Sequence, residues 1–272
     1  MIRVTVLGSG TSHGVPAIGC GCDVCRSTDP RDKRTRPSIL IEIVPGAQAP
    51  AFMGEAFAGA VRSILVDTST DLRAQALARD VRRVDAILFT HAHADHVFGI
   101  DDVRRYNQMQ KGAIACFADA GTVASLRRMF AYIFEPPKQV GGGLPQLALF
   151  RIAGAFSLGG VEIVPVPLFH GALPVLGFRI GSFAYLTDCN RIPDGSLALL
   201  AGVRTLIIDA LRHRRHSTHF SVTEATAVAA SLGVERAYFT HICHDLGHVV
   251  TCAALPAGVE LAYDGLVLEV ET

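Results

Sequence analysis

The chain has 272 residues, of which 50% are hydrophobic and 18% are charged, and its formal net charge is zero. This composition predicts a large apolar core and excludes disorder over most of the chain. A net charge of zero also argues against a broad basic face that captures nucleic acid electrostatically.

The start of the chain and its cysteines indicate a compartment. Residues 1–7 resemble a strand running into Gly8-Ser9-Gly10, rather than the basic and apolar regions of a secretion signal. No apolar run is long enough to cross a bilayer. The seven cysteines are an odd number, and three fall within six residues, which favours metal binding in a reducing compartment over a disulfide framework. We therefore expect a cytoplasmic protein without a membrane partner.

Short apolar runs alternate with helical patterns along the whole chain. Ser221 stands at the N-cap position of the last helical pattern, with Glu224 at the capping-box position. Strands mixed with helices throughout predict one α/β domain spanning residues 1–272, with residues 45–60 and 136–145 as insertions or loops. The predicted strands are residues 3–7, 38–44, 63–66, 85–89, 161–166, 177–180, 184–186, 205–208, 237–239 and 266–270, and the predicted helices are residues 71–80, 95–108, 122–130 and 222–232.

Two pairs of segments echo each other, and each places a polar side chain at the end of a buried strand. Residues 87–91, which end at His91, resemble residues 237–241, which end at His241. Residues 64–67, which end at Asp67, resemble residues 184–188, which end at Asp188. Because α/β sheets bind ligands at the carboxyl ends of their strands, two facing halves could bring these side chains into one crevice.

The run His91-x-His93-x-Asp95-His96 follows a predicted strand and precedes a predicted helix. In an extended turn His91 and His93 project to the same side, because side chains alternate along extended chain. Asp95 and His96 can then point back from the first helical turn. Two imidazoles and a carboxylate suit Zn²⁺, Mn²⁺ or Fe²⁺. The run therefore predicts a metal site rather than a solvated turn.

One such run cannot complete the shells of two metals, so further ligands are needed. His170, Asp188 and His241 each follow a predicted strand. A single histidine at a strand end is more often structural than a ligand. The shared position of these three residues, together with the main run, makes each of them a candidate ligand.

With these residues in place, the sequence resembles the metallo-β-lactamase superfamily. The stretch 8–16, followed by Cys20-x-Cys22-x-x-Cys25, narrows the resemblance to the cyclic phosphodiesterases associated with bacterial phosphonate breakdown. It extends from residue 1 to the Tyr263-Asp264-Gly265 near the end of the chain. The resemblance implies an αββα sandwich with metals at one edge.

The resemblance also implies two divalent metals, zinc or manganese, and a role for each candidate residue. A hydroxide between the metals would be the nucleophile, because coordination lowers the pKa of water from 15.7 to about 7. Asp95 and Asp188 thereby count as catalytic residues as well as ligands. One metal would take His91, His93 and His170, the other would take Asp95, His96 and His241, and Asp188 would bridge them.

The cysteine run forms a second candidate site. Three thiolates as close as Cys20, Cys22 and Cys25 favour Zn²⁺. His244 is the expected fourth ligand because similar proteins use a histidine there, with Asp245 and His248 as alternatives. Four protein ligands leave no open position for a substrate, so this zinc would be structural. Three unligated thiols in a loop are the competing interpretation.

A general acid is expected in the basic segment 212–221. This segment precedes the helix that begins near Ser221, and a helix N-terminus favours anions. Related enzymes place a histidine here to protonate the leaving alkoxide, and imidazole titrates near neutrality. We expect His219 to take this role, with His216 as the alternative. Asp67 and Asp209, at the ends of apolar strands, are expected to orient metal-binding imidazoles.

These observations predict a metal-dependent phosphodiesterase acting on a small or cyclic phosphodiester. A tRNA 3′-processing endonuclease is a second hypothesis, because related nucleases carry a run like His216-Ser217-Thr218. Zero net charge and the lack of a long basic arm make nucleic acid an unexpected partner. A thioester or lactone hydrolase using the same metals is a third hypothesis, and a non-enzymatic metal-binding module is a fourth. The oligomeric state is left open, with a homodimer as one option.

Overall fold

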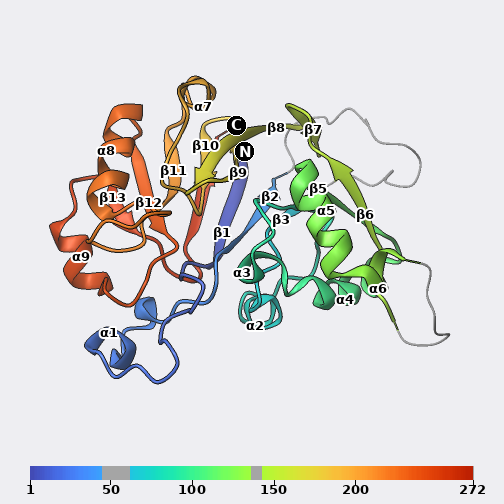
Figure 1. Cartoon of the computed structure of the whole chain (residues 1–272), viewed down its shortest axis with the longest axis horizontal. Coiled ribbons are helices and arrows are strands. Elements are labelled where there is room, and N and C mark those ends of the chain that lie inside the picture. Colours follow the sequence, from blue (N-terminus) through green and yellow to red (C-terminus); the bar gives the residue numbers. More distant parts are fainter. Residues whose placement is uncertain (45–61, 136–142, 272) are drawn as a thin grey trace.

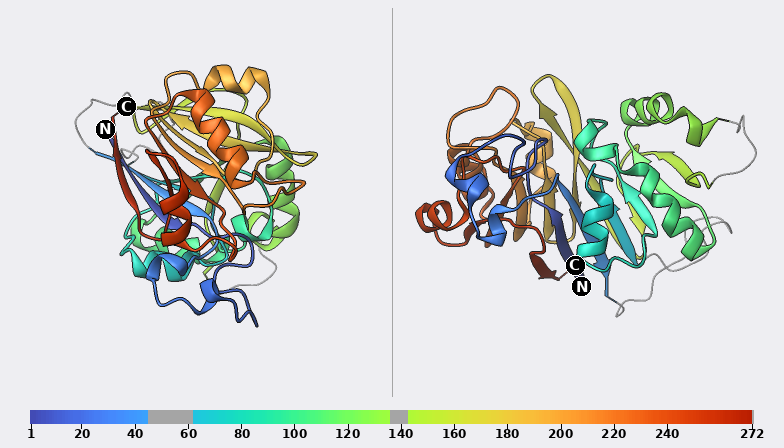
Figure 2. Two further views of the ribbon diagram at one scale, coloured as in Figure 1. Left: turned by 90° about the vertical axis from the view of Figure 1, so that its left-hand side faces the viewer. Right: turned by 90° about the horizontal axis from the view of Figure 1, so that it is seen from below.

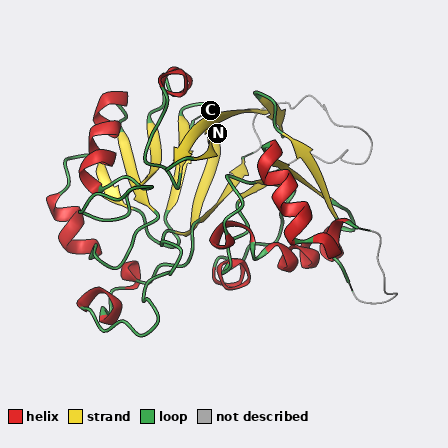
Figure 3. Cartoon of the chain, viewed as in Figure 1, coloured by secondary structure: helices red, strands yellow, loops and turns green. Residues whose placement is uncertain are grey.

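Two seven-stranded β-sheets lie face to face, and helices cover the outer face of each (Figures 1 and 3). The computed structural model describes residues 1–44, 62–135 and 143–271. The αββα sandwich predicted from the sequence is therefore confirmed. The two termini lie side by side, since the first and last strands pair through Ile2 and Val270 (Figure 2).

The first sheet combines antiparallel and parallel pairing. Its antiparallel part joins β14, β1, β2 and β3, and its parallel part joins β3, β4, β5 and β6. The carboxyl ends of β3 and β4 consequently meet at one edge. The strands in spatial order are β14 (Val267–Val270), β1 (Ile2–Gly8), β2 (Ser38–Ile43), β3 (Ser63–Val66), β4 (Ala86–Leu88), β5 (Ile114–Ala118) and β6 (Leu147–Arg151).

The second sheet repeats this plan. Strands β10 to β13 are parallel, whereas β7, β8, β9 and β10 pair antiparallel. Strand β8 therefore runs in the direction of β10, and its carboxyl end lies at the same edge. The strands in spatial order are β13 (Val259–Leu261), β12 (Arg236–Thr240), β11 (Thr205–Asp209), β10 (Phe183–Leu186), β9 (Leu173–Ile180), β8 (Val161–His170) and β7 (Phe156–Leu158).

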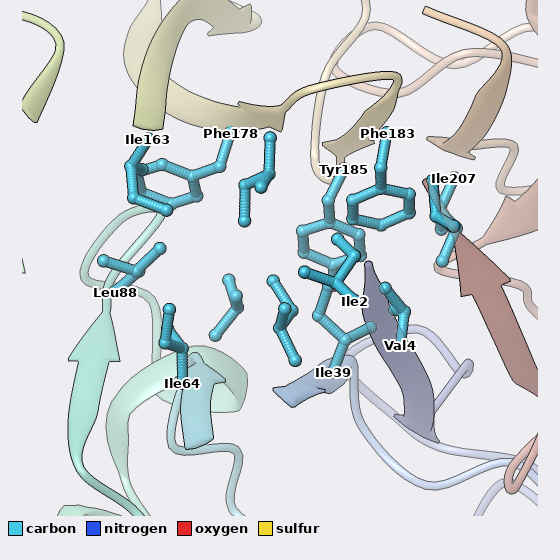
Figure 4. Close-up of a cluster of buried hydrophobic side chains, with 14 of the residues drawn as sticks. Ile2, Val4, Ile39, Ile64, Leu88, Ile163, Phe178, Phe183, Tyr185 and Ile207 are labelled. Carbon is cyan, nitrogen blue, oxygen red and sulfur yellow. The ribbon is translucent and has the colours of Figure 1, made fainter. Parts of the chain in front are cut away.

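Alternation along the strands builds three apolar layers. Val4 and Ile64 point between the sheets, where they meet Phe178 and Phe183 of the second sheet (Figure 4). Leu65 points the other way, toward the helices. The first sheet is covered by α2 (Leu72–Ala78), α3 (Ala94–Val97), the 3-10 helix η3 (Ile100–Val103), α4 (Arg104–Gln110), α5 (Ala120–Met129) and α6 (Ala131–Phe134), and the second by α7 (Asp194–Leu199), α8 (Val222–Leu232) and α9 (His248–Ala254).

One predicted helix differs from the observed structure because it is broken into shorter helices. The single helix expected over residues 95–108 is wrong, because it is divided into α3, η3 and α4. The break occurs at Gly99, whose N–H donates to Thr68 O at 2.9 Å instead of continuing the helical ladder. The helix over residues 222–232 is confirmed, together with the capping box of Ser221 and Glu224.

Other elements were not predicted, among them β5, β6, α7 and α9. The insertion expected at residues 45–60, and most of the loop expected at 136–145, lie outside the described residues. None of the described helices is long and apolar enough to span a membrane.

Candidate metal centre

Five predicted site residues stand at or just after the carboxyl ends of five strands. His170 is the last residue of β8, Asp209 is the last of β11, and His241 directly follows β12. Asp67 and Asp188 follow β3 and β10. Asp67, Asp188 and His241 have φ angles of 62°, 50° and 59°, a left-handed conformation that non-glycine residues adopt rarely. The two pairs of similar segments are therefore corresponding strands of the two sheets. Strands β3 and β4 of the first sheet correspond to β10 and β12 of the second.

Asp188 is the centre of the cluster. Its Oδ1 lies 3.1 Å from His96 Nε2 and 3.2 Å from His241 Nε2, and its Oδ2 lies 3.8 Å from His91 Nε2. Asp95 Oδ2 is 3.5 Å from His96 Nε2 and 3.6 Å from His241 Nε2. One carboxylate therefore faces imidazoles from both sheets.

Three candidate metal groups share Asp188. The first contains Asp95, His96, Asp188 and His241, the second contains His91, His93 and Asp188, and the third contains His170, Asp188 and His219. His170 lies beside the second group, with its ring centroid 5.2 Å from that of His93 and 5.9 Å from that of His91. The seven residues predicted as ligands are thus brought together, and their role as ligands stays a prediction.

The donor atoms fit divalent metals. Among the described residues, the Nε2 atoms of His91, His96 and His241 are buried without a hydrogen-bond partner. Buried polar atoms are rarely left unpaired, so three that converge on one carboxylate are suited to a cation. Burial and the neighbouring His96 lower the pKa of His91 well below its usual value.

Surrounding side chains fix the orientation of the imidazoles. Asp67 Oδ2 lies 2.7 Å from His96 Nδ1 and accepts the hydroxyl of Thr90 at 2.7 Å. Thr90 Oγ1 is also 3.0 Å from His91 Nδ1. His170 Nδ1 lies 2.8 Å from the carbonyl oxygen of Thr218. Asp67 contacts a candidate ligand, as expected. The sequence did not predict a role for Thr90. A signal was present, because Thr90 precedes His91 in the same way as Thr240 precedes His241 in the similar segment.

His219 lies between the cluster and the second sheet. Its Nδ1 is 2.6 Å from Asp209 Oδ2, and its ring centroid is 4.5 Å from the centroids of both His170 and His241. Burial lowers its pKa. His216, the alternative general acid, is less buried, with its ring centroid 5.2 Å from that of His219. Asp209 therefore contacts the candidate acid, and it also lies in one group with the predicted ligand His241.

The cysteine run also meets its expected partner. His244 Nδ1 lies 3.1 Å from the Sγ of Cys20, 3.4 Å from that of Cys22 and 3.6 Å from that of Cys25. The backbone N–H of Cys25 donates to the thiol of Cys22 and lowers its pKa to about 6, whereas burial raises the pKa of Cys25 to about 11. Four donors this close fit zinc. Asp245, which the sequence left open as the fourth ligand, pairs with Arg214 instead.

Buried Arg34 joins the N-terminal loop to the segment that carries His241 and His244, a contact that the sequence did not predict. Its guanidinium donates to the carbonyl oxygens of Cys243 at 3.2 Å and Leu246 at 2.7 Å. The backbone N–H of Ile242 also donates to Ser9 O at 2.9 Å. Hydrogen bonds therefore join the N-terminal loop, which carries the cysteines, to the segment that carries His241 of the other candidate site.

Comparison with known proteins agrees with this geometry. The family model of the beta-lactamase superfamily domain matches residues 62–242. A solved structure of a diphosphatase of the PhnP family is 41% identical, with a TM-score of 0.86 over 100% of this chain and 98% of the other. A zinc-bound PqqB from Methylobacterium extorquens, 20% identical, shares the fold with a TM-score of 0.74 over 98% of this chain and 100% of the other.

A curated relative is much longer than this chain. It is an octanoyltransferase from Porphyromonas gingivalis, 35% identical over 267 residues, which are 97% of this chain and 51% of the relative. This chain spans about half the length of that relative. The activity in its name belongs to the whole relative, and half of that protein has no counterpart here.

Proposed function

The chain belongs to the beta-lactamase superfamily, and on this premise we propose that it is a metal-dependent phosphodiesterase acting on a small or cyclic phosphodiester. The observation that carries the proposal is the convergence of buried imidazoles with unpaired Nε2 atoms on Asp188. Such a donor set supports cation binding, because the buried Nε2 atoms face a carboxylate and form no hydrogen bond of their own.

The proposed ligands are those expected from the sequence: His91, His93 and His170 for one metal, Asp95, His96 and His241 for the other, and Asp188 for both. Two divalent cations, zinc or manganese, would supply an activated water and neutralise charge on the phosphate oxygens. The chain's own residues contribute the geometry. Asp67 and Thr90 hold the imidazoles so that their Nε2 atoms face the centre.

His219 is the proposed general acid. Asp209 holds its Nδ1, which leaves Nε2 free to donate a proton to the leaving alkoxide oxygen. Burial lowers the pKa of His219 in the free protein, but a bound phosphodiester anion opposes that shift, because a nearby negative charge favours the protonated ring.

The likeness to the diphosphatase favours a second candidate, hydrolysis of a diphosphate bond at the same site. The tRNA endonuclease and the thioester or lactone hydrolase would use the same ligands. The cysteine cluster is proposed to hold a structural zinc, and its free thiols are the reason to propose a cytoplasmic location.

A substrate panel on metal-reconstituted protein tests the proposal. It contains bis(p-nitrophenyl) phosphate, adenosine 2′,3′-cyclic phosphate, ribose 1,2-cyclic phosphate, ADP, an acyl thioester and a precursor tRNA. We expect the highest kcat/KM for a small phosphodiester, with loss of turnover after chelation. The highest kcat/KM for ADP would support the second candidate instead, and turnover of the thioester or tRNA alone would refute both.

A further inference from the structure

Asn190 stands two residues after Asp188, in the segment that follows β10. Its backbone N–H donates to Phe169 O at 2.9 Å, and the N–H of Phe169 donates to Arg191 O at 3.0 Å. These two bonds pair the segment with the end of β8, directly before the predicted ligand His170. The backbone of Asn190 is therefore fixed next to the strand end that carries His170.

The side-chain amide of Asn190 connects two loops. Its Oδ1 accepts the backbone N–H of Gly171 at 2.8 Å, and its Nδ2 donates to the carbonyl oxygen of Ser217 at 2.8 Å. Because one partner can only donate and the other can only accept, the partners fix the orientation of the amide. Gly171 directly follows His170, and Ser217 lies two residues before the candidate acid His219. One side chain therefore joins the loop of a predicted ligand to the loop of the candidate acid.

The two loops are also in direct contact. His170 Nδ1 lies 2.8 Å from the carbonyl oxygen of Thr218. Gly171 has a φ of 64°, and a Cβ at this position would lie 2.8 Å from Thr218 Cγ2, so the left-handed backbone and the close approach both favour glycine. The N–H of Phe220 donates to Cys189 O at 2.9 Å. The acid loop is therefore held at residues 218 and 220, on either side of its candidate acid.

We propose that Asn190 is a positioning residue for the general acid, which holds residues 216–219 against the strand end that carries His170. This inference rests on the proposed function and deepens it. The hydrogen bond to Ser217 O acts on the acid loop, whereas the hydrogen bond from Gly171 N–H anchors the amide of Asn190 itself. An amide neither gains nor loses a proton near neutral pH, so Asn190 acts through His219 and is not an acid itself.

The test compares a poor and a good leaving group. Adenosine 2′,3′-cyclic phosphate releases an alkoxide, and bis(p-nitrophenyl) phosphate releases a nitrophenolate, which needs no acid. We expect Asn190→Ala to lower kcat/KM about 10-fold for the cyclic substrate and about 2-fold or less for the aryl substrate, because a small misplacement of a catalytic group can cost up to about 100-fold. Asn190→Ala should cost little more when His219 is already alanine, since residues that act as a unit give non-additive losses.

A conservative variant and a matched control sharpen the test. Asn190→Asp keeps the shape of the side chain and the acceptor for Gly171 N–H, but it removes the donor to Ser217 O. It should therefore lower the ratio of kcat/KM for the cyclic substrate to kcat/KM for the aryl substrate, as Asn190→Ala does. The control is Asn107→Ala, because the Asn107 amide also bridges backbone groups, those of Gly112 and Gln146, but from α4. This control should leave the ratio unchanged.

Amide hydrogen exchange on the metal-reconstituted protein separates this inference from the proposed function, because it needs no turnover. We expect faster exchange over residues 213–219 in Asn190→Ala than in the wild type, and no change there in Asn107→Ala. If no phosphodiester were hydrolysed, the proposed function would fail, and this faster exchange would still support the positioning role. Unchanged exchange, equal losses of kcat/KM on both substrates, or loss of metal in Asn190→Ala would overturn the positioning role while leaving a phosphodiesterase intact.

Discussion

Among single residues, Asp188 has the largest number of roles. It is 2% exposed, it lies in a left-handed turn, and it faces His91, His96 and His241. Burial raises its pKa, but the facing imidazoles outweigh this and hold the pKa well below its ordinary value. Its side chain is therefore an anion that three histidines surround.

Replacement of this anion should abolish turnover. Asp188→Asn keeps the shape of the side chain but removes the charge shared by the two proposed metals, so we expect kcat/KM to fall by on the order of 10³-fold or more. Steady-state kinetics and metal analysis check this result. Asp194→Asn, on the exposed start of α7, is the control for loss of an acidic charge. Retained activity in Asp188→Asn would contradict the bridging role.

The contribution of His219 to the hydrolysis rate should be larger for a poorer leaving group. An alkoxide needs a proton in the transition state, whereas a nitrophenolate leaves without one. We expect His219→Ala to slow hydrolysis of a sugar cyclic phosphodiester by about 10²- to 10⁴-fold and of an aryl phosphodiester much less. Measurements of kcat/KM on both substrates test this, with exposed His213→Ala as control.

Three outcomes would change the assignment of His219. Equal losses on both substrates would remove its role as general acid. Loss of metal would make it a ligand, in keeping with its place beside His170 and Asp188. The selective loss in His216→Ala instead would move the role to His216.

Among the elements, α8 fixes the segment that carries His219. Ser221, two residues after His219, is the N-cap of the helix. Its hydroxyl accepts from the N–H of Glu224, and the Glu224 carboxylate accepts from the N–H of Ser221. Ser221→Ala should lower the free energy of unfolding by about 1 kcal/mol, because it leaves helix N–H groups unpaired. Urea denaturation measures this, with exposed Ser231→Ala near the end of the same helix as control. Equal effects of the two substitutions would count against the cap.

At the scale of the whole molecule, three metal positions are predicted for each chain. Two are predicted around Asp188, at the edge where the strands of both sheets end, and one is predicted where the N-terminal loop meets His244. Elemental analysis after reconstitution should approach three metals per chain, with zinc at the cysteines. A value of at most one metal would contradict both sites.

Cys22→Ser separates the two kinds of site. The variant should lose one zinc and unfold at a lower temperature, because a structural zinc contributes to folding free energy. Each kcal/mol lost lowers Tm by roughly 2–4 °C in a domain this large. Activity should fall less than in Asp188→Asn, and Cys252→Ser, outside the cluster, is the control. Unchanged Tm and zinc content in Cys22→Ser would refute the structural site.

The sequence by itself determined the fold class and most of the candidate site. Strand segments such as residues 63–66 are short, apolar and bounded by polar turns, and the capping residues of α8 act over four positions, so local chemistry was enough. The ligands within residues 91–96 share one turn, and their spacing alone brings them together. The resemblance to a known family supplied the ligand partners that lie far away in the chain.

Only the tertiary structure decided which distant groups meet. Gly99 breaks the expected helix because its N–H donates to Thr68 O. The hydrophobic pattern of residues 95–108 does not predict that contact. Thr90 touches His91 and Asp67 because β3 and β4 end at the same edge. Such contacts depend on the pairing of strands and helices, which residue spacing along one segment does not encode.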